Sequence, residues 1–373
     1  MKFRSTVGQA PMVGFCEALL QGIAPDGGLY VPEKFPSVDL TDFAGASIIA
    51  PTWAGVLAAS LPVICQEAFS FPIPLKSIPS DAGPLHVLEL FHGPTAAFKD
   101  VGARFLAACF ERLNGSEQLP LTILVATSGD TGGAVAAAFH GRANTRVVVL
   151  FPKGLVSGRQ EKQLCCWGDN VLSLRVNGNF DDCQRMVKQA FADAKFNQAV
   201  RLSSANSINL GRLLPQAVYY ACASLNYWRA TGEKLNFVIP TGNLGNGQAC
   251  VWAKTMGFPI GKIVFATNEN RPIPDYLETG NWAPGASVAT LASAMDVGNP
   301  SNMERLRDLL PDVGKMRAAV SAYPVSDEDI RRQISRDEVA RGETWCPHTA
   351  TAAHVYDGFS ETEKAQSWAL VAT

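Results

Sequence analysis

The segment LTILVATSGDTGGAVAAAF, residues 121–139, carries the clearest fold signal in the chain. Its first six residues form an apolar run of strand length that is rich in β-branched side chains. The next seven, TSGDTGG, contain the glycines of a tight turn, and the alanine-rich run that follows is typical of a helix. We therefore predict a buried strand, a glycine loop and a helix in that order.

The same order recurs in FVIPTGNLGNGQACVWAKTMG, residues 237–257. Other strand-length apolar runs lie at residues 85–90, 146–151, 171–176 and 263–266, and helical patterns separate most of them. This alternation predicts an α/β fold in which crossover helices connect mostly parallel strands. A chain of 373 residues exceeds one typical core, so we expect two α/β lobes.

Both glycine loops are suited to anions. Glycines let backbone N–H groups converge at the start of a helix, where the helix dipole favours a phosphate or a carboxylate. The simpler alternative for each loop is a tight turn of the kind found in any α/β protein.

A lysine stands at the centre of FHGPTAAFKDVGARF, residues 91–105. Pro94 suits the entry to a helix, and apolar residues recur at helical spacing after Lys99. Lys99 is either a surface lysine that begins a helix or an amine in apolar surroundings, which would favour Schiff-base chemistry. One reactive lysine with two anion loops describes a pyridoxal-phosphate site: the lysine for the aldehyde, one loop for the cofactor phosphate and the other for the substrate.

Several segments together resemble the threonine synthase family, whose fold is shared with tryptophan synthase β and the serine/threonine dehydratases. The resembling segments are MKFRSTVGQAPMVGFCEALLQGIAPDGGLYVPE at the N-terminus, GPTAAFKD, TSGDTGGA, PTGNLGNGQA, NSINLGRLLPQ and MDVGNPSNMERL. The N-terminal segment resembles the bacterial and fungal branch. The resemblance covers nearly the whole chain.

The resemblance implies a fold type II pyridoxal-phosphate enzyme with two α/β/α lobes. It divides the chain into an N-terminal region packed on the large lobe (1–85), a small lobe with the lysine and the substrate loop (86–200), and a large lobe with the cofactor-phosphate loop (201–373).

The resemblance also implies the residues of the site, with Lys99 as the catalytic residue bound covalently to the cofactor. The other cofactor-binding residues would be Asp130, Gly242, Asn243, Leu244, Gly245, Asn246 and Thr373. The substrate-binding residues would be Thr127, Ser128, Thr131, Asn206, Ser207 and Arg212. From the residues alone, Asn206 and Ser207 could equally form an N-cap cluster at the entry to a helix, and a fixed guanidinium beside them suits a phosphate ester.

The implied reaction converts O-phospho-L-homoserine and water to L-threonine and phosphate, by γ-elimination of phosphate and addition of water at Cβ. A serine/threonine dehydratase or a phospho-lyase, which would release a keto acid, needs the same lysine and loops. A nicotinamide dehydrogenase is a further alternative, but the order of Gly242, Gly245 and Gly247 does not match the dinucleotide fingerprint, and Lys99 would have no role. A non-catalytic paralogue is the third alternative.

Composition restricts the partners. The net charge of −2 gives no reason to expect nucleic acid, and no apolar run is long enough for a membrane span. The five histidines show no metal-ligand spacing, so we expect no metal site. Nine cysteines without a Cys-x-x-Cys pair indicate buried, reduced thiols in a cytoplasmic protein. We expect a small-molecule substrate and a monomer or homodimer.

The C-terminus departs from the family pattern. The chain ends at LVAT, residues 370–373, where related sequences usually continue. Thr373 matches the family position whose hydroxyl faces the pyridine nitrogen of the cofactor. We therefore expect a shortened protein whose activity the missing segment could reduce, because that segment would ordinarily cover apolar surface.

Overall fold

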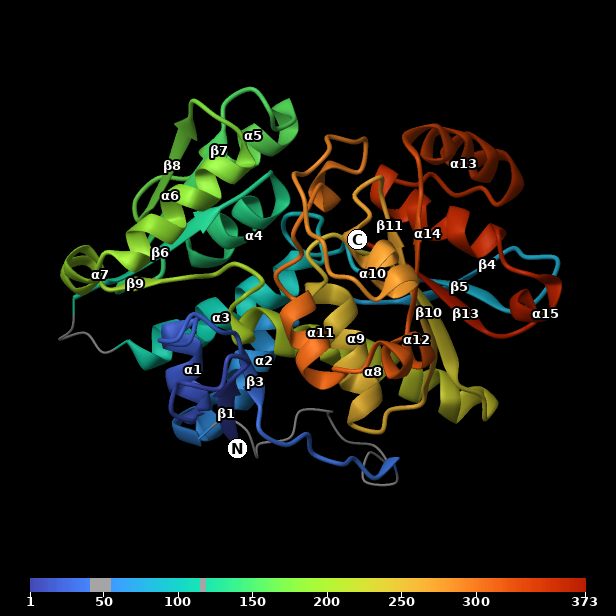
Figure 1. The fold of residues 1–373 in the computed structure, drawn as a ribbon, viewed down its shortest axis with the longest axis horizontal. Coiled ribbons are helices and arrows are strands. Elements are labelled where there is room, and N and C mark those ends of the chain that lie inside the picture. Colours follow the sequence, from blue (N-terminus) through green and yellow to red (C-terminus); the bar gives the residue numbers. More distant parts are fainter. Residues whose placement is uncertain (41–54, 115–118) are drawn as a thin grey trace. The chain divides into compact units, whose positions relative to one another are not determined.

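A computed structural model describes residues 1–40, 55–114 and 119–373 (Figure 1). The described residues divide into two compact units. The first contains the described residues of 1–34, 55–72 and 92–215, and the second contains those of 35–40, 73–91 and 216–373. The three-part division expected from the family resemblance stays a prediction, and these units have other bounds.

The elements of the first unit are β1 (Lys2–Ser5), β2 (Val13–Gly14), α1 (Phe15–Gln21), β3 (Tyr30–Pro32), the 3-10 helix η3 (Gly55–Ser60), α2 (Leu61–Ala68), α3 (Lys99–Leu113), β6 (Leu121–Ala126), α4 (Asp130–Phe139), β7 (Thr145–Pro152), α5 (Gly158–Cys165), β8 (Val171–Val176), α6 (Phe180–Ala192), α7 (Ala194–Val200), β9 (Leu202–Ser203) and the start of α8 (Leu210–Thr231).

A four-stranded parallel sheet of order β8-β7-β6-β9 forms the centre of this unit. Every residue of β6 is buried, as expected for a strand covered on both faces. Helices α4 and α6 both pack against β7. The strands and the crossover helices predicted from residues 121–191 are therefore confirmed.

The N-terminal part of the first unit is a small antiparallel sheet of order β2-β1-β3. Asp26, in the turn signal PDGG, organises it. One carboxylate oxygen accepts from the hydroxyl of Ser5 at 2.7 Å and the other from the backbone N–H of Ala10 at 2.7 Å. These bonds hold the connections between the short strands. The apolar pattern of residues 53–69 predicts a helix. Residues 53 and 54 lie outside the described residues, and η3 and α2 cover the part that follows.

The elements of the second unit are β4 (Leu75–Ile78), β5 (Leu85–Glu89), the remainder of α8, β10 (Leu235–Pro240), α9 (Gly245–Thr255), β11 (Ile260–Thr267), α10 (Pro272–Thr279), the 3-10 helix η4 (Ser293–Met295), α11 (Met303–Leu309), α12 (Val313–Ala319), β12 (Ser321–Pro324), α13 (Asp327–Ala340), α14 (Pro347–Asp357), α15 (Glu361–Lys364) and β13 (Trp368–Ala372).

A six-stranded sheet of order β12-β11-β10-β13-β5-β4 forms the centre of the second unit, and only the edge strand β4 runs antiparallel. The last strand of the chain, β13, lies between β10 and β5, and all five of its residues are buried. Helix α14 covers one part of the sheet, and Ala353 and Tyr356 share a core cluster with Val238 and Leu370.

One strand assignment needs correction. The sequence division placed the strand at residues 85–90 at the start of the small lobe, next to Lys99. The structure places β5 in the sheet of the second unit, where Leu88 pairs with Val371. The reason is that sheet membership depends on a partner strand almost three hundred residues later in the chain, which no local pattern reveals. Within the described residues, no helix is both long enough and apolar enough to cross a membrane.

Candidate functional site

Helix α3 begins at Lys99, as predicted, and a buried carboxylate fixes the turn before it. Asp100 is 1 % exposed and accepts hydrogen bonds from the backbone N–H of Thr95 at 2.8 Å and from its hydroxyl at 2.7 Å. A Cβ atom at Gly93 would lie 2.5 Å from the Asp100 carboxylate. Sequence reasoning missed this role of Asp100. An acidic residue in the first turn, five residues after a threonine in a Gly-Pro turn, was the available signal.

The Lys99 amine lies against the first glycine loop. Its Nζ donates to the carboxylate of Asp130 at 3.0 Å and lies 4.8 Å from the ring centroid of Phe98. The side chain of Lys99 is 14 % exposed. The expected apolar surroundings are therefore wrong in one respect, since a carboxylate neutralises the ammonium. A charge removed from water needs such a partner.

The second oxygen of Asp130 accepts from Nε2 of Gln160 at 2.9 Å, so the carboxylate is held from two sides. Gln160 also approaches Gly129, where any Cβ atom would clash with the Gln160 amide. Gly129 has a φ of 142°, a conformation that L side chains rarely adopt. The glycine therefore lets Gln160 reach Asp130.

Thr127 shapes this loop from inside. Its side chain is buried, and its Oγ1 accepts from the backbone N–H groups of Gly129 at 3.0 Å and Gly132 at 2.9 Å. These two N–H groups are thus occupied within the loop. Ser128 and Thr131, which were predicted to contact the substrate, are half-buried beside it.

The two predicted substrate elements meet within the first unit. Nδ2 of Asn206 donates to the carbonyl of Ala126, the last residue of β6, at 3.2 Å. The Oδ1 atom of Asn206 is buried and has no hydrogen-bond partner in the part of the chain that the structure describes. Ser207 follows and is half-buried. An unsatisfied buried acceptor of this kind is expected where a ligand or water binds.

Arg212 lies in the first turn of α8 and is 2 % exposed. Its guanidinium donates to the carbonyl of Ala205. Burial lowers the pKa of Arg212 to about 10, and the negative charge of Asp100 acts in the opposite direction. A side chain at Gly102 would clash with the backbone of Arg212, so α3 and α8 approach closely there. Arg212 thus joins the lysine helix to the predicted substrate cluster.

The second glycine loop, residues 241–246, follows β10 in the second unit. Leu244 is buried and adopts a φ of 63° as the residue before α9. Two residues that follow η4 hold Asn243. The backbone N–H of Ser301 donates to Oδ1 of Asn243 at 2.6 Å, and Nδ2 of Asn302 donates to the carbonyl of Asn243 at 3.0 Å. A Cβ atom at Gly242 would lie 2.6 Å from Cα of Met295. The loop is therefore fixed before any ligand binds.

The first turn of α9 fits a phosphate group. Both Tyr219 and Tyr220 donate their hydroxyls to Oδ1 of Asn246, the second of these at 2.9 Å. This leaves Nδ2 of Asn246 buried and without a partner among the described residues. Helix N-termini also carry backbone N–H groups without intrahelical partners. The glycine cradle, the fixed loop and this donor together suit the phosphate of pyridoxal phosphate.

Thr373 follows β13 and is half-buried. A thiol lies next to it, with the sulfur of Cys346 4.0 Å from the Thr373 carbonyl, 3.8 Å from Nδ1 of His348 and 3.4 Å from the hydroxyl of Thr349. Nε2 of His348 accepts from the N–H of Ala294 at 3.1 Å, so neutral His348 carries its proton on Nδ1 and can donate to the sulfur.

Burial raises the pKa of the Cys346 thiol, but the donors from His348 and Thr349 outweigh burial and bring the pKa to about 7. Sequence reasoning missed Cys346, although a cysteine two residues before a histidine was a visible signal. The expectation of buried thiols is wrong for Cys165 and Cys166, which are exposed. Cys346 is also exposed as a residue, although its sulfur lies against His348 and Thr349, and all nine cysteines are free. Among the residues that the structure describes, no cluster of histidine, cysteine and carboxylate side chains is placed to hold a metal ion.

Comparisons with known proteins agree on one family. A family model described as pyridoxal-phosphate dependent enzyme matches residues 72–373, and one described as threonine synthase N terminus matches residues 2–48. Threonine synthase from Haemophilus influenzae is 40% identical over 352 residues, which cover 92% of this chain and 81% of that protein.

Solved structures give the same result. The crystal structure of threonine synthase from Escherichia coli has a TM-score of 0.89 and 36% identity, with 100% of this chain and 88% of that chain covered. The structure of threonine synthase with bound pyridoxal phosphate from Brucella melitensis has a TM-score of 0.89 and 35% identity, with the same coverage. The predicted fold class, a type II pyridoxal-phosphate enzyme with mostly parallel sheets, is therefore confirmed.

Proposed function

The chain belongs to the threonine synthase family of pyridoxal-phosphate-dependent enzymes, and on this premise we propose that it converts O-phospho-L-homoserine and water to L-threonine and phosphate. The observation that carries the proposal is the position of Lys99. Its side chain is mostly buried, and its amine donates a hydrogen bond to Asp130 of the first glycine loop. A reactive amine has to lie close to the reacting group, and Lys99 lies beside the loop that is proposed to bind the substrate.

Pyridoxal phosphate, when bound, supplies an aldehyde for an amine and a conjugated ring that withdraws electrons from the substrate carbons. The residues proposed to hold it are Lys99, Asp130, Gly242, Asn243, Leu244, Gly245, Asn246 and Thr373. The glycine cradle at residues 242–245 and the unpartnered Nδ2 of Asn246 support the phosphate part of this assignment. The neutral hydroxyl of Thr373 is proposed to face the ring nitrogen.

Lys99 is also the proposed general base. When Nζ is not bound to the cofactor, it can take a proton from the substrate carbon and later return one. A lysine amine held out of water can change its protonation state during a reaction. The carboxylate of Asp130, fixed by Gln160, keeps Nζ in one position. Asp130 is thus proposed as a positioning residue for the proton transfer.

We propose that the leaving phosphate is bound by Asn206, Ser207 and Arg212. The buried guanidinium of Arg212 supports this assignment, because it is a charged donor on the helix that approaches α3 closely. The unsatisfied Oδ1 of Asn206 is an acceptor, so it suits a proton donor of the ligand or a bound water. Ser128 and Thr131 are proposed to bind the amino-acid part. Thr127 was predicted as a substrate contact, and its internal hydrogen bonds support a role in shaping the loop.

Other aspects of the function rest on the family alone. We propose that the protein acts in the cytoplasm as a monomer or a homodimer, on a small-molecule substrate. The family is likewise the basis for the proposed division into an N-terminal region, a small lobe and a large lobe.

The decisive experiment incubates purified, cofactor-loaded protein with O-phospho-L-homoserine and measures phosphate and threonine together. Equal release of the two products is the expected result. Phosphate with 2-oxobutanoate in place of threonine would indicate a related lyase. Cofactor absorbance without either product would indicate a non-catalytic paralogue.

A further inference from the structure

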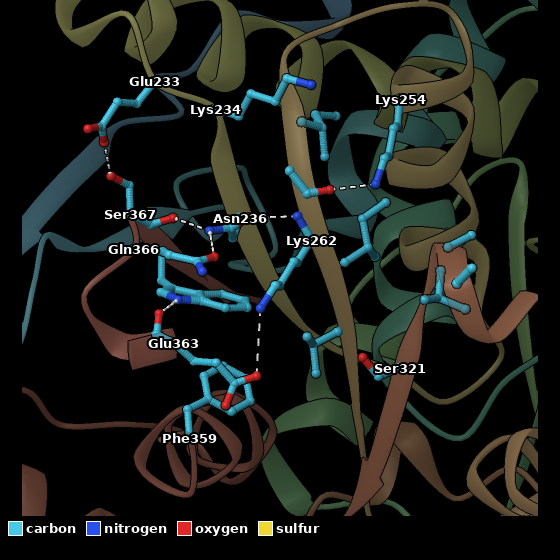
Figure 2. Close-up of a pocket in the computed structure, with 18 of the residues that line it drawn as sticks. Glu233, Lys234, Asn236, Lys254, Lys262, Ser321, Phe359, Glu363, Gln366 and Ser367 are labelled. Carbon is cyan, nitrogen blue, oxygen red and sulfur yellow. Dashed lines mark hydrogen bonds and ion pairs between the residues drawn. The ribbon is translucent and has the colours of Figure 1, made fainter. Parts of the chain in front are cut away.

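A separate cavity of about 700 Å³ lies within the second unit (Figure 2). The first residues of parallel strands line it, among them Ile260 of β11, Ser321 of β12 and Trp368 of β13. The glycine loop 241–246 follows the opposite, carboxyl end of β10. The cavity is therefore distinct from the proposed cofactor-phosphate site, although β10 connects the two.

Asn236 fixes the floor of this cavity. Its Nδ2 donates to the carbonyl of Ser367 at 3.0 Å, and its Oδ1 accepts from the backbone N–H of Lys262 at 2.6 Å. Gly261 has no room for a side chain, because a Cβ atom there would clash with Oδ1 of Asn236. The side chain of one strand thus ties its two neighbours together, and the cavity is formed before any ligand binds.

Basic side chains outnumber acidic ones in the lining, which contains Lys234, Lys254, Lys262, Arg317, Glu233 and Glu363. Two of the cations are already engaged. The guanidinium of Arg317 donates to the carbonyl of Leu277 through Nε and to the carbonyl of Glu278 at 2.9 Å. Nζ of Lys262 lies 3.7 Å from the carboxylate of Glu363 (Figure 2).

The other two cations, Lys234 and Lys254, retain donors. Nζ of Lys254 donates to the carbonyl of Gly261 at 2.6 Å, which uses one of its three hydrogens. Lys234 is exposed and makes no hydrogen bond or ion pair within the described parts of the chain. Figure 2 shows both side chains at the same end of the cavity.

Neither of these two lysines forms an ion pair with a carboxylate of the described residues. Burial lowers the pKa of Lys254, Cys250 acts in the opposite direction, and the positive charge of Lys234 lowers the pKa further. The carboxylate of Glu233 accepts from the hydroxyl of Ser367 at 2.8 Å and is turned toward it. A ligand with negative charge would relieve the repulsion between the two lysines.

We propose that this cavity binds a small oxyanion with two or more negative charges, held by Lys234 and Lys254. Charge-assisted hydrogen bonds from both ammonium groups would fix its oxygens, and a concave, positively charged site concentrates anions. Polycarboxylates and phosphate compounds both present several negatively charged oxygens of this kind. Citrate and inorganic phosphate are probes that distinguish these two sources.

The test is calorimetric titration of each probe into the cofactor-loaded protein at low ionic strength. Saturable binding of one equivalent of at least one probe is expected, and Lys234→Gln should weaken it about tenfold, the effect of losing one charged hydrogen bond. Lys315→Gln is the matched control, because Lys315 is an exposed lysine of the same unit outside the cavity and its loss changes the net charge equally. Binding that Lys234→Gln leaves unchanged, or that Lys315→Gln weakens to the same degree, would overturn the proposal.

A second measurement does not depend on the variants. Nuclear magnetic resonance of labelled lysine side chains reports the pKa of Lys254 directly, and the bound probe should raise that pKa because the anion stabilises the charged ammonium. An unchanged pKa of Lys254 at saturating probe would overturn the proposal. Phosphate bound only at the proposed product site would give this result, together with an affinity that Lys234→Gln does not alter.

Discussion

At position 99, the ammonium group donates to a carboxylate that is itself held in place. Asp130 neutralises the charge of Lys99 and receives a second bond from Gln160, so the amine has one preferred position. The side chain can therefore be both largely removed from water and oriented. These two properties suit a residue that forms a covalent bond with a cofactor and later transfers a proton.

Lys99→Ala is expected to abolish turnover and to remove the visible absorbance that a covalently bound cofactor gives. The reason is that alanine provides no amine for the aldehyde. Absorbance spectra and product assays of the purified variant measure both effects. Lys153→Ala is the control, because Lys153 is an exposed lysine of the same unit and its loss should change neither quantity. A covalently bound cofactor in Lys99→Ala would contradict the assignment.

Arg212→Ala is expected to lower kcat/KM for O-phospho-L-homoserine about tenfold to a hundredfold, while the cofactor stays bound. Loss of a charged hydrogen bond to the substrate phosphate has this size. Because Arg212 is buried, thermal unfolding must be measured in parallel. Arg212→Lys keeps the charge without the planar guanidinium and should recover part of the loss. An unchanged kcat/KM in Arg212→Ala would remove Arg212 from the substrate site.

Cys346 should react with alkylating reagents at a lower pH than an ordinary thiol. Its pKa of about 7 means that the reactive thiolate is scarce below pH 7 and predominates above it. Mass spectrometry of iodoacetamide labelling across pH should show a half-maximal rate near pH 7. Cys165 is the internal control, because burial raises the pKa of that thiol and its labelling should need a higher pH.

His348→Phe should shift the labelling of Cys346 toward about pH 8.5, the ordinary range of a thiol, because it removes the Nδ1 donor. A labelling midpoint above pH 8.5 in the unmodified protein would show that the hydrogen bonds to the sulfur do not stabilise the thiolate.

Among the elements of the fold, the two strand–loop–helix units use different devices to shape their loops. In the first, a threonine hydroxyl collects backbone N–H groups from within the loop. In the second, the Asn243 side chain and carbonyl are held by residues 301 and 302, far along the chain. The first loop is consequently a local structure, whereas the second depends on the packing of η4 and α11 around it.

Thr127→Val tests the first device. Valine keeps the shape of the side chain but leaves the N–H groups of Gly129 and Gly132 buried without their acceptor. The free energy of unfolding should fall by about 2 kcal/mol or more, since each unsatisfied buried group costs about 1–3 kcal/mol. Urea unfolding measures the change. Thr362→Val, at an exposed position of α15, should stay within about 0.5 kcal/mol. Equal stability of the two variants would show that the hydroxyl does not hold the loop.

For the whole molecule, cofactor binding should be coupled to stability. A ligand that binds only the folded protein adds about 2.7 kcal/mol at a concentration one hundred times its Kd. The thermal midpoint of the cofactor-free protein should therefore rise with pyridoxal phosphate concentration. A midpoint that is independent of the cofactor would contradict the proposed site.

Gly242→Ala should reduce this rise, because a Cβ atom there would lie 2.6 Å from the backbone of Met295 and displace the loop. Gly285→Ala is the matched control in the same unit, since a Cβ atom at Gly285 meets open space. Thermal unfolding with and without pyridoxal phosphate, compared between these two variants, separates loss of the cofactor site from a general effect of alanine.

The sequence by itself determined the local units and the family. Local patterns of a few residues predicted the strands at residues 121–126 and 171–176, the helix that begins at Lys99 and both glycine loops. Such patterns can be recognised without knowledge of the fold. The family motifs are continuous segments for the same reason. The predicted roles of single residues in the site remain predictions.

Only the tertiary structure decided which distant segments meet. It placed β13 in the middle of the second sheet, moved β5 into that sheet, set Asp130 against Lys99, and brought the sulfur of Cys346 to the end of β13. The physical reason is that strand pairing and the burial of polar groups are satisfied by partners far apart in the chain. Local propensity carries no information about which partner that will be.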